Sequence, residues 1–449
     1  MKKTSLIGHL VELLDSVRNL THPADNVVKG FFRSRHYLGS KDRLFISDAL
    51  YSILRNFTLL RVYIEETLLT IEARHPTDLP PSLALYAALA VKLRAENPSA
   101  LLPDIAALWR SYVSNIECSA FLNALKNVEI PSAISQNTAS RVAVSNSIPE
   151  AIVQEWIDRY GFREAEQLCM ALNQPAPITV RVNTSKVSVE ECRLELEKEG
   201  IKSTPTLHSP YGLILERRIN AQSHASFKQG FFEMQDEGSQ LISMLLEPTP
   251  GETVVDACAG GGGKSLHIAA MMRNAGSLYS VEVNEKRLRN IRDRIGRAGA
   301  SIIRVCLTDR DKKTMRALHG KADKVLIDSP CSGIGTFRRN PGAKLFFTVE
   351  SVERMTEIQR LVLERYSELV KPGGRLVYST CTLLRKENED VVEWFLSRHQ
   401  DFVPLPATDI LKRQGIQIDS KSHFLTLLPH RTSTDGFFAA IMERRTPAR

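Results

Sequence analysis

Two cysteines follow neighbouring predicted strands near the C-terminal third of the chain. Cys331 lies in "DSPCSGIGTFRRNPG", and Cys381 lies in "LVYSTCTLL". A free cysteine is most often a buried packing residue. Two of them at adjacent strand ends, one flanked by Asp328 and by the basic pair Arg338 and Arg339, instead favour chemistry, because nearby cations lower a thiol pKa and the thiolate is the reactive form.

A run of four glycines precedes this region, in "DACAGGGGKSLHIAAMM". Gly260–Gly263 would let backbone amides approach a ligand closely just before a helix. A P-loop would need glycine where Cys258 stands, and a G-x-G-x-x-G reading fails at Ser265 and Leu266. The loop therefore predicts a nucleoside ligand without a triphosphate.

Acidic residues end the next predicted strands. Glu282 lies 22 residues after Gly260, a spacing that suits a ribose diol. Asp309 and Asp328 end the third and fourth strands. Each acid alone is weak support, because aspartate is common in turns, but together they predict an adenosyl cofactor lying across one sheet edge.

The elements that must position these residues alternate between strand and helix from residue 236 to residue 449. Near-continuous apolar strands in this alternation predict an α/β fold with a doubly wound, mostly parallel sheet. Ligands of such sheets bind beyond the carboxyl ends of the strands. The predicted strands are "TVVDAC", "SLYSVEV", "SIIRVCL", "KVLIDS", "RLVYST", "HFLTLLP" and "GFFAAIME".

Two further regions precede the sheet. Residues 1–145 show apolar residues at three- and four-residue spacing, which predicts an all-helical domain. A polar linker is predicted at "SAISQNTASRVAVSNS". Residues 146–235 predict two helices followed by a small α+β element, with the order strand, helix, strand, strand.

The composition of the chain indicates which kinds of partner it could bind. The 449 residues carry a net charge of +8, which makes a polyanionic partner plausible without demanding one. Between residues 281 and 320 there are eleven Lys/Arg against five Asp/Glu, which fits phosphate contacts or solvated helix faces equally well. The seven cysteines include no Cys-x-x-Cys pair, so no zinc site is expected. Without a signal sequence or an apolar span, we expect a cytoplasmic protein that binds no membrane.

These motifs carry a resemblance to a known family. "DSPCSGIGTFRRNP", "GGRLVYSTCTLLRKENEDVVEWFL", "DACAGGGGKS", "FFEMQDEGSQLI" and "DGFFAAIMER" resemble the Sun-type (Fmu) RNA cytosine-5 methyltransferases, which use S-adenosylmethionine. The resemblance spans residues 149–444 and implies a Rossmann-like methyltransferase sheet. The N-terminal helices, with "LGSKDRLFISDALYSILRN", look like the NusB-like RNA-binding domain of the ribosomal RNA branch.

The resemblance implies a role for each matching residue. Cys381 would be the nucleophile, Cys331 would assist product release, and Asp328 would face both cofactor and target base, with Lys264 nearby. Glu282 would bind the ribose and Asp309 the adenine. The methionine part would be held by Cys258, Ala259, Gly260, Gly261, Gly262 and Gly263.

The glycine loop departs from the family pattern. That pattern usually reads Cys-Ala-Ala-Pro-Gly-Gly-Lys, whereas here Gly260 and Gly261 replace alanine and proline. A more flexible loop would bind the cofactor more weakly. Glu282 in place of the more usual aspartate is a smaller departure.

The implied chemistry agrees with the residues. Carbon 5 of cytosine is a poor nucleophile, so a thiolate must first attack carbon 6, while an acid near ring nitrogen 3 stabilises the developing charge. A stacked base cannot react, so the expected substrate is a single-stranded or flipped cytosine in RNA. Arg338 and Arg339, beside the thiol loop, are the candidate RNA contacts, and a monomer is expected.

Three alternatives differ in what they require. A DNA cytosine-5 methyltransferase would normally carry a Glu-Asn-Val motif, which the sequence lacks. A transfer RNA substrate stays open, although the helical N-terminal region favours ribosomal RNA. An RNA-binding ribosome assembly factor without catalysis is disfavoured because both cysteines, Asp328 and Lys264 are present.

Overall fold

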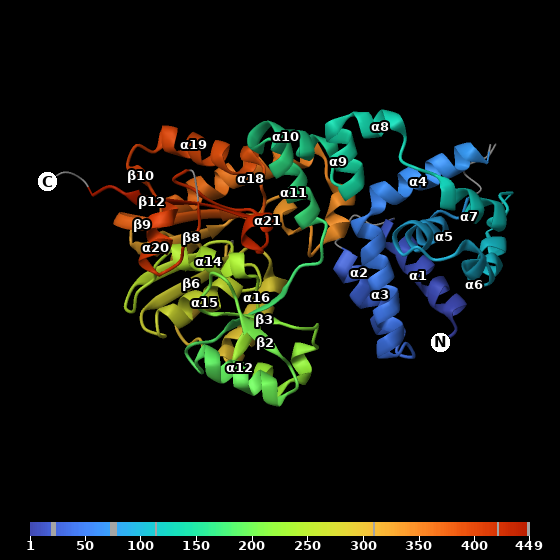
Figure 1. The fold of residues 1–449 in the computed structure, drawn as a ribbon. Helices are drawn as coiled ribbons and strands as arrows, with labels where there is room; N and C mark the ends of the chain where they lie inside the picture. The colour runs from blue at the N-terminus through green and yellow to red at the C-terminus, as the bar shows by residue number, and fades with distance from the viewer. Residues whose placement is uncertain (19–23, 72–78, 113–114, 309, 420–421, 447–449) are drawn as a thin grey trace. The chain divides into compact units, whose positions relative to one another are not determined.

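The computed structural model describes residues 1–18, 24–71, 79–112, 115–308, 310–419 and 422–446. These form two compact units (Figure 1). A helical unit comprises Met1–Pro175 with Phe337–Phe347, and a sheet unit comprises Ala176–Thr336 with Thr348–Arg449. This division differs from the predicted boundaries after residues 145 and 235. The helices that follow residue 149 pack with the N-terminal helices, and the small and large sheets share one unit.

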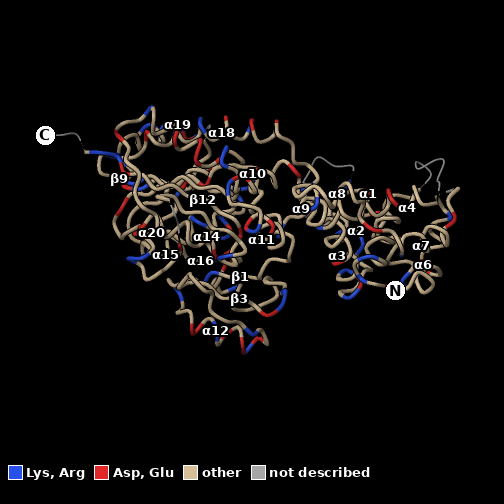
Figure 2. The backbone as a smooth tube through the Cα atoms, turned by 45° about the horizontal axis from the view of Figure 1, so that its top comes forward, with Lys and Arg blue, Asp and Glu red and all other residues tan. Residues whose placement is uncertain are grey.

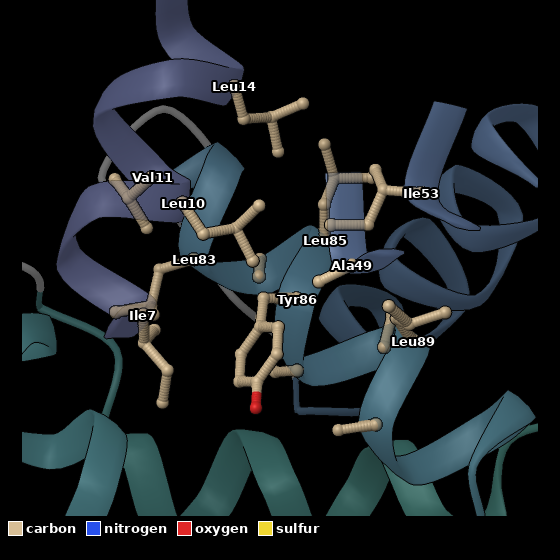
Figure 3. Packing of buried hydrophobic residues seen from close by; sticks show 14 of the residues in the cluster. Ile7, Leu10, Val11, Leu14, Ala49, Ile53, Leu83, Leu85, Tyr86 and Leu89 are labelled. Atoms are coloured by element: carbon tan, nitrogen blue, oxygen red, sulfur yellow. The ribbon is translucent and has the colours of Figure 1, made fainter. Parts of the chain in front are cut away.

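The helical unit has the all-helical character that the apolar spacing predicts. Figure 3 shows its core, to which Leu10, Ile53 and Tyr86 contribute from three helices. All three side chains are fully buried. The helices are α1 (Lys3–Arg18), α2 (Ala24–Ser34), α3 (Ser40–Arg55), α4 (Phe57–Thr70), α5 (Pro81–Ala88), the π-helix η2 (Leu89–Leu93), α6 (Pro98–Ser111), α7 (Cys118–Asn127), α8 (Ser132–Gln136), α9 (Thr138–Asn146), α10 (Glu150–Tyr160) and α11 (Phe162–Leu172).

The predicted polar linker at residues 132–147 is wrong, because α8 and α9 occupy it. The side chain of Asn137 accepts a hydrogen bond from the Ser140 amide at 3.0 Å and so caps α9. Val142 and Ala143 are buried on the inner face of α9. A short helix whose outer face is rich in serine and asparagine resembles a linker in composition.

One segment of the helical unit lies far from its other residues in the sequence. Residues 337–347, which include the short helix η5 (Pro341–Phe346), belong to the helical unit although their flanks belong to the sheet unit. Lys344 anchors the segment by donating to Asn173 Oδ1 at 2.6 Å and to the Asn146 carbonyl at 3.0 Å. Burial, with a smaller effect of Arg55, lowers the pKa of Lys344 to about 7.

The sheet unit begins with a small antiparallel sheet of order β2-β3-β1-β4. Its strands are β1 (Ile178–Val182), β2 (Ser203–Pro205), β3 (Gly212–Leu215) and β4 (Phe232–Met234). The first three were predicted, whereas β4 is too short to show a period. The helix between β1 and β2, α12 (Val189–Lys198), opens with a capping box of Ser188 and Glu191 and carries charges of both signs (Figure 2).

The large sheet follows the order β10-β12-β9-β8-β5-β6-β7, with β11 paired to β12. Strands β5 to β9 run parallel, which confirms the predicted α/β fold, and β12 joins β9 antiparallel, so the sheet is mixed. The strands are β5 (Thr253–Asp256), β6 (Ser277–Glu282), β7 (Ile303–Leu307), β8 (Ala322–Asp328), β9 (Val370–Thr380), β10 (Phe402–Leu405), β11 (Leu425–Leu427) and β12 (Phe437–Arg444). The edge strand β10 was not predicted.

Helices cover both faces of the large sheet (Figure 1). Alternate strand residues face opposite ways, so Val254 packs into one core and Val255 into the other. No helix in the described ranges is both long and apolar enough to cross a membrane. One face carries α14 (Glu237–Leu245), α15 (Gly263–Met271), α16 (Glu285–Ala298) and α20 (Ala407–Arg413), and the other carries α17 (Lys312–Leu318), α18 (Val349–Ser367) and α19 (Glu389–Arg398).

Candidate active site

The two cysteines predicted to act together lie in contact. Their strands, β8 and β9, are parallel neighbours, so their carboxyl ends meet at one sheet edge. The Cys331 and Cys381 sulfur atoms are 3.3 Å apart, and both residues are partly exposed. The hydrogen bond with Cys381, followed by burial, raises the pKa of Cys331 well above its ordinary value. Cys331 therefore keeps its proton at neutral pH.

A buried ion pair lies at the same edge. Lys264 Nζ, in the first turn of α15, donates to Asp328 Oδ2 at 2.6 Å. Burial alone would lower the pKa of Lys264, but Asp328, with smaller contributions from Asp256 and Cys381, outweighs it and raises that pKa. The side chain of Asp328 is 31% exposed, so a ligand can reach it.

Asp328 is also held from the neighbouring strand. Ser379 Oγ, on β9, donates to Asp328 Oδ1 at 3.2 Å. Ser379 lies two residues before Cys381, and Asp328 lies three before Cys331. The carboxylate and the two thiols are thus fixed by the same pair of strand ends.

The glycine loop turns sharply between β5 and α15. Gly260 has φ of 55° and Gly262 has φ of 78°, values that side chains rarely adopt. A Cβ on Gly262 would also lie 3.1 Å from the Ile291 side chain. In the same loop, burial raises the pKa of Cys258 well above its ordinary value, and Ala259 is buried, so both pack as small apolar residues.

Glu282 ties the end of β6 to this loop. Its Oε2 accepts from the Gly260 amide at 2.9 Å, and its Oε1 accepts from the Val283 and Asn284 amides at 2.8 and 2.9 Å. The structure thus places Glu282, the residue predicted to bind the ribose, beside the glycine loop. Asp309, the residue predicted to bind the adenine, lies outside the described residues.

A buried carboxyl group supports the loop from below. Asp256, the last residue of β5, is fully buried, and Ser265 Oγ donates to its Oδ2 at 2.5 Å. Burial raises the pKa of Asp256 to about 6, and the hydrogen bond from Ser265 opposes part of that rise.

Sequence reasoning missed Glu387, which holds the Cys331 loop. This fully buried carboxylate accepts from the Ser332 amide at 2.8 Å, from Ser332 Oγ at 2.5 Å and from Gln359 Nε2 at 2.8 Å. Gln359 also donates to the Pro330 carbonyl at 3.0 Å. Both neighbours of Cys331 are therefore fixed. In the sequence, Glu387 lies in "RKENED", which reads as a solvated helix start.

Two glycines allow the loops behind the thiols to touch. Gly335 N donates to the Cys381 carbonyl at 2.9 Å, and Gly436 N donates to the Gly335 carbonyl at 2.8 Å. A Cβ on Gly335 would lie 2.1 Å from the Gly436 carbonyl oxygen, which excludes any larger residue. This contact fixes the backbone of Cys381 and was not predicted.

The structure separates the two arginines predicted to bind RNA. Arg338 is buried in the helical unit, and its Nη2 donates to the Pro175 carbonyl at 3.4 Å. A buried guanidinium engaged in this way does not fit a phosphate contact, so the predicted RNA contact of Arg338 needs correction. Arg339 is exposed, and its contact with RNA stays a prediction.

Comparisons with known proteins agree with this geometry. The sequence model of a family described as "16S rRNA methyltransferase RsmB/F" matches residues 243–443, and that of an RsmF/B-like ferredoxin-like domain matches residues 148–222. A probable ribosomal RNA small subunit methyltransferase B of Bacillus subtilis is 31% identical over 99% of this chain and 100% of its own length.

Solved structures extend the similarity to the fold. The crystal structure of PH0851 matches with a TM-score of 0.78 and 26% identity, covering 99% of each chain. A methyltransferase homolog protein from Pyrococcus horikoshii matches with a TM-score of 0.58 and 29% identity, covering 70% of this chain and 99% of that one. Because the family models and a full-length relative agree, the chain belongs to the RsmB/F family of 16S rRNA methyltransferases.

Proposed function

We propose that this protein methylates carbon 5 of a cytosine in 16S ribosomal RNA, with S-adenosylmethionine as donor, through a covalent bond between Cys381 and ring carbon 6. The observation that carries this proposal is the 3.3 Å contact of two thiols at the strand ends that also hold the Lys264–Asp328 pair. A lone reactive thiol would need no such partner. A thiol pair suits a reaction in which one sulfur attacks and the other assists its departure.

The glycine loop fits the donor. Gly260 and Gly262 turn the backbone where a side chain would be strained, which leaves room for close approach of a ligand. Glu282 lies at the end of the next strand, where a ribose would be reached. S-adenosylmethionine supplies an electrophilic methyl group when it is bound there.

The four catalytic residues divide the work. Cys381 attacks carbon 6 as its thiolate, which makes carbon 5 nucleophilic. The Lys264 ammonium, which Asp328 holds at the site, stabilises the negative charge that develops at ring nitrogen 3. After methylation, a water molecule takes the proton from carbon 5. The electrons of that C–H bond re-form the ring double bond, and the bond between carbon 6 and Cys381 breaks with the sulfur leaving as a thiolate. Cys331 retains its proton and donates a hydrogen bond to the departing sulfur.

The substrate follows from the family. The Bacillus subtilis relative, named for the small-subunit ribosomal RNA, aligns over both units of this chain, which supports ribosomal rather than transfer RNA. We assign RNA binding to the small sheet and to the NusB-like helical unit. An assembly factor without catalysis would have no use for the paired thiols.

Methyl transfer to matched RNA tests the proposal. The purified protein, radiolabelled S-adenosylmethionine and a 16S ribosomal RNA transcript should yield 5-methylcytosine at one position, mapped by bisulfite sequencing. A transfer RNA transcript and a DNA oligonucleotide of the same sequence serve as controls. Labelling of the transfer RNA alone would reassign the substrate. Absence of cofactor binding in calorimetry at millimolar concentration would favour the assembly factor.

A further inference from the structure

The four-glycine loop is held by side chains that lie outside it. A run of glycines loses more conformational entropy on ordering than any other sequence, so such a loop needs restraint. Two arginines donate to its carbonyl groups. Arg294 Nη1, on α16, donates to the Gly261 carbonyl, and Arg181 Nη1, on β1, donates to the Gly263 carbonyl at 2.6 Å.

Arg294 is itself fixed by the small sheet. Its Nε and Nη2 donate to Glu233 Oε2 at 3.2 and 2.9 Å, while Arg297 Nη2 donates to Glu233 Oε1 at 2.6 Å. Glu233 lies on β4 and is 4% exposed, so this carboxylate is a buried anchor for two cations. A guanidinium can hold a carboxylate and a carbonyl at once because its donors form a rigid fork.

Arg181 secures the other end of the loop. It is 1% exposed, and besides Gly263 it donates to Gln235 Oε1 at 2.6 Å. The Gly263 carbonyl belongs to the peptide that joins Gly263 to Lys264. Holding that peptide therefore orients Lys264 toward Asp328.

The guanidinium of Arg294 also occupies the space beside Gly261. A Cβ built on Gly261 would lie 3.1 Å from Arg294 Nη1. A side chain at position 261 and this arginine therefore compete for the same volume. The amide of Gly262 meanwhile donates to the Ala259 carbonyl at 2.8 Å, so the peptide between Gly261 and Gly262 is held at both ends.

We propose that Arg294 is a positioning residue for the cofactor loop, with Arg181 in the same role at its far end. Glu233 and Gln235 set both arginines, so the small sheet determines the shape of the loop. The arginines supply from outside the rigidity that four glycines lack. The inference rests on the proposed function only where it names S-adenosylmethionine as the ligand.

Calorimetry and hydrogen exchange on the full-length protein test this inference. Arg294→Ala should weaken S-adenosylmethionine binding about tenfold, the effect of losing one hydrogen bond to a charged group. In the absence of cofactor, amide hydrogen exchange in residues 258–264 should be faster in Arg294→Ala than in the unmodified protein. Arg294→Lys keeps a charge near Glu233 but loses the fork, so it should behave like Arg294→Ala. Arg292→Ala, an exposed arginine on the same helix, is the matched control and should match the unmodified protein.

Substitution of Gly261 separates positioning from general stability. Gly261→Ala should weaken binding in the otherwise unmodified protein, because it displaces the guanidinium. In the Arg294→Ala background the same change should strengthen binding, because the space is open and alanine restricts the backbone. An effect of the same sign in both backgrounds, or Arg294→Ala exchange rates equal to those of Arg292→Ala, would overturn the inference. If the unmodified protein bound no cofactor, the proposed function would fail, and loop exchange would still decide this point.

Discussion

The sulfur atoms of Cys331 and Cys381 lie 3.3 Å apart although the residues are 50 positions apart in the chain. Two parallel strands and a contact between two glycines hold them there. The hydrogen bond with Cys381, followed by burial, raises the pKa of Cys331, so this thiol retains its proton at neutral pH. In the proposed reaction, Cys381 attacks and Cys331 donates.

Removing each thiol should have a different result. Cys381→Ala should abolish methyl transfer, because no adduct at carbon 6 can form. Cys331→Ala should permit one transfer and then leave RNA attached to the protein, because the departing sulfur has lost its donor. A denaturing gel with labelled RNA shows which variant carries RNA. RNA retained by Cys381→Ala and normal turnover by Cys331→Ala would reverse the roles.

Loss of Asp328 should destabilise the sheet unit. Asp328→Asn leaves the buried Lys264 ammonium without its counter-ion, at a cost of about 3 kcal/mol, the lower end of the range for buried pairs, because Asp328 is partly exposed. Lys264→Met in the same chain should restore most of that stability without restoring activity. Urea denaturation of the two single variants and the double variant measures the coupling, and additive losses would show that the pair contributes little.

Glu387 should control release more than methyl transfer. Glu387→Gln weakens the hydrogen bonds that hold Ser332, so Cys331 loses its fixed position. We expect near-normal first transfer in a single-turnover assay, slower steady-state turnover and accumulation of the RNA adduct. Glu393→Gln, an exposed change on α19, is the control. If the first transfer and the steady-state turnover slowed equally, Glu387 would instead have a general packing role.

Stability should depend on pH through Asp256. Its pKa rises from 3.8 to about 6 on folding, chiefly through burial, so the folded state holds the extra proton between these values. The group's stabilising contribution is full below about pH 4 and is lost as pH rises through about 6. Relative to Asp256→Asn, which stays neutral, the unmodified protein should lose about 2 kcal/mol between about pH 4 and 7. Urea denaturation at several pH values measures the free energy of unfolding of both proteins. If that free energy changed with pH in the same way in both, the raised pKa of Asp256 would be contradicted.

The two neighbouring arginines should respond differently to substitution. Arg339→Ala should weaken RNA binding and reduce the slope of log affinity against log salt by about one. Arg338→Ala should leave that slope unchanged and lower the stability of the helical unit, because it removes a buried side chain bonded to the Pro175 carbonyl. Binding titrations at several salt concentrations, with thermal denaturation, distinguish the two.

The sequence predicted the parts of the site that strand ends carry. Parallel strands place their carboxyl ends together, so the convergence of Cys331, Cys381 and Asp328 followed from strand order alone. The glycine loop and Glu282 were found for the same reason. Local pattern was sufficient because each of these residues lies at the end of a strand of the sheet core or in the loop that follows it.

The residues that hold the site could not be found in this way. Glu387 and Ser332 are 55 positions apart, and Arg181 reaches Gly263 across 82. A buried carboxylate or guanidinium looks like a surface charge until the fold supplies its partner. Strand β10 was missed because its four residues, FVPL, are too few to show a period. Helices α8 and α9 were missed because short helices with polar outer faces leave little periodicity.

The excursion of residues 337–347 into the helical unit limits how this gene can be divided. An expression clone that starts at residue 176 would still encode residues 337–347 but would lack the helices against which they pack. Phe337, 1% exposed in the intact chain, would then meet water, and Lys344 would lose the acceptors at Asn146 and Asn173. Fusion or shuffling of the sheet unit onto another N-terminal partner would require redesign of these eleven residues as well.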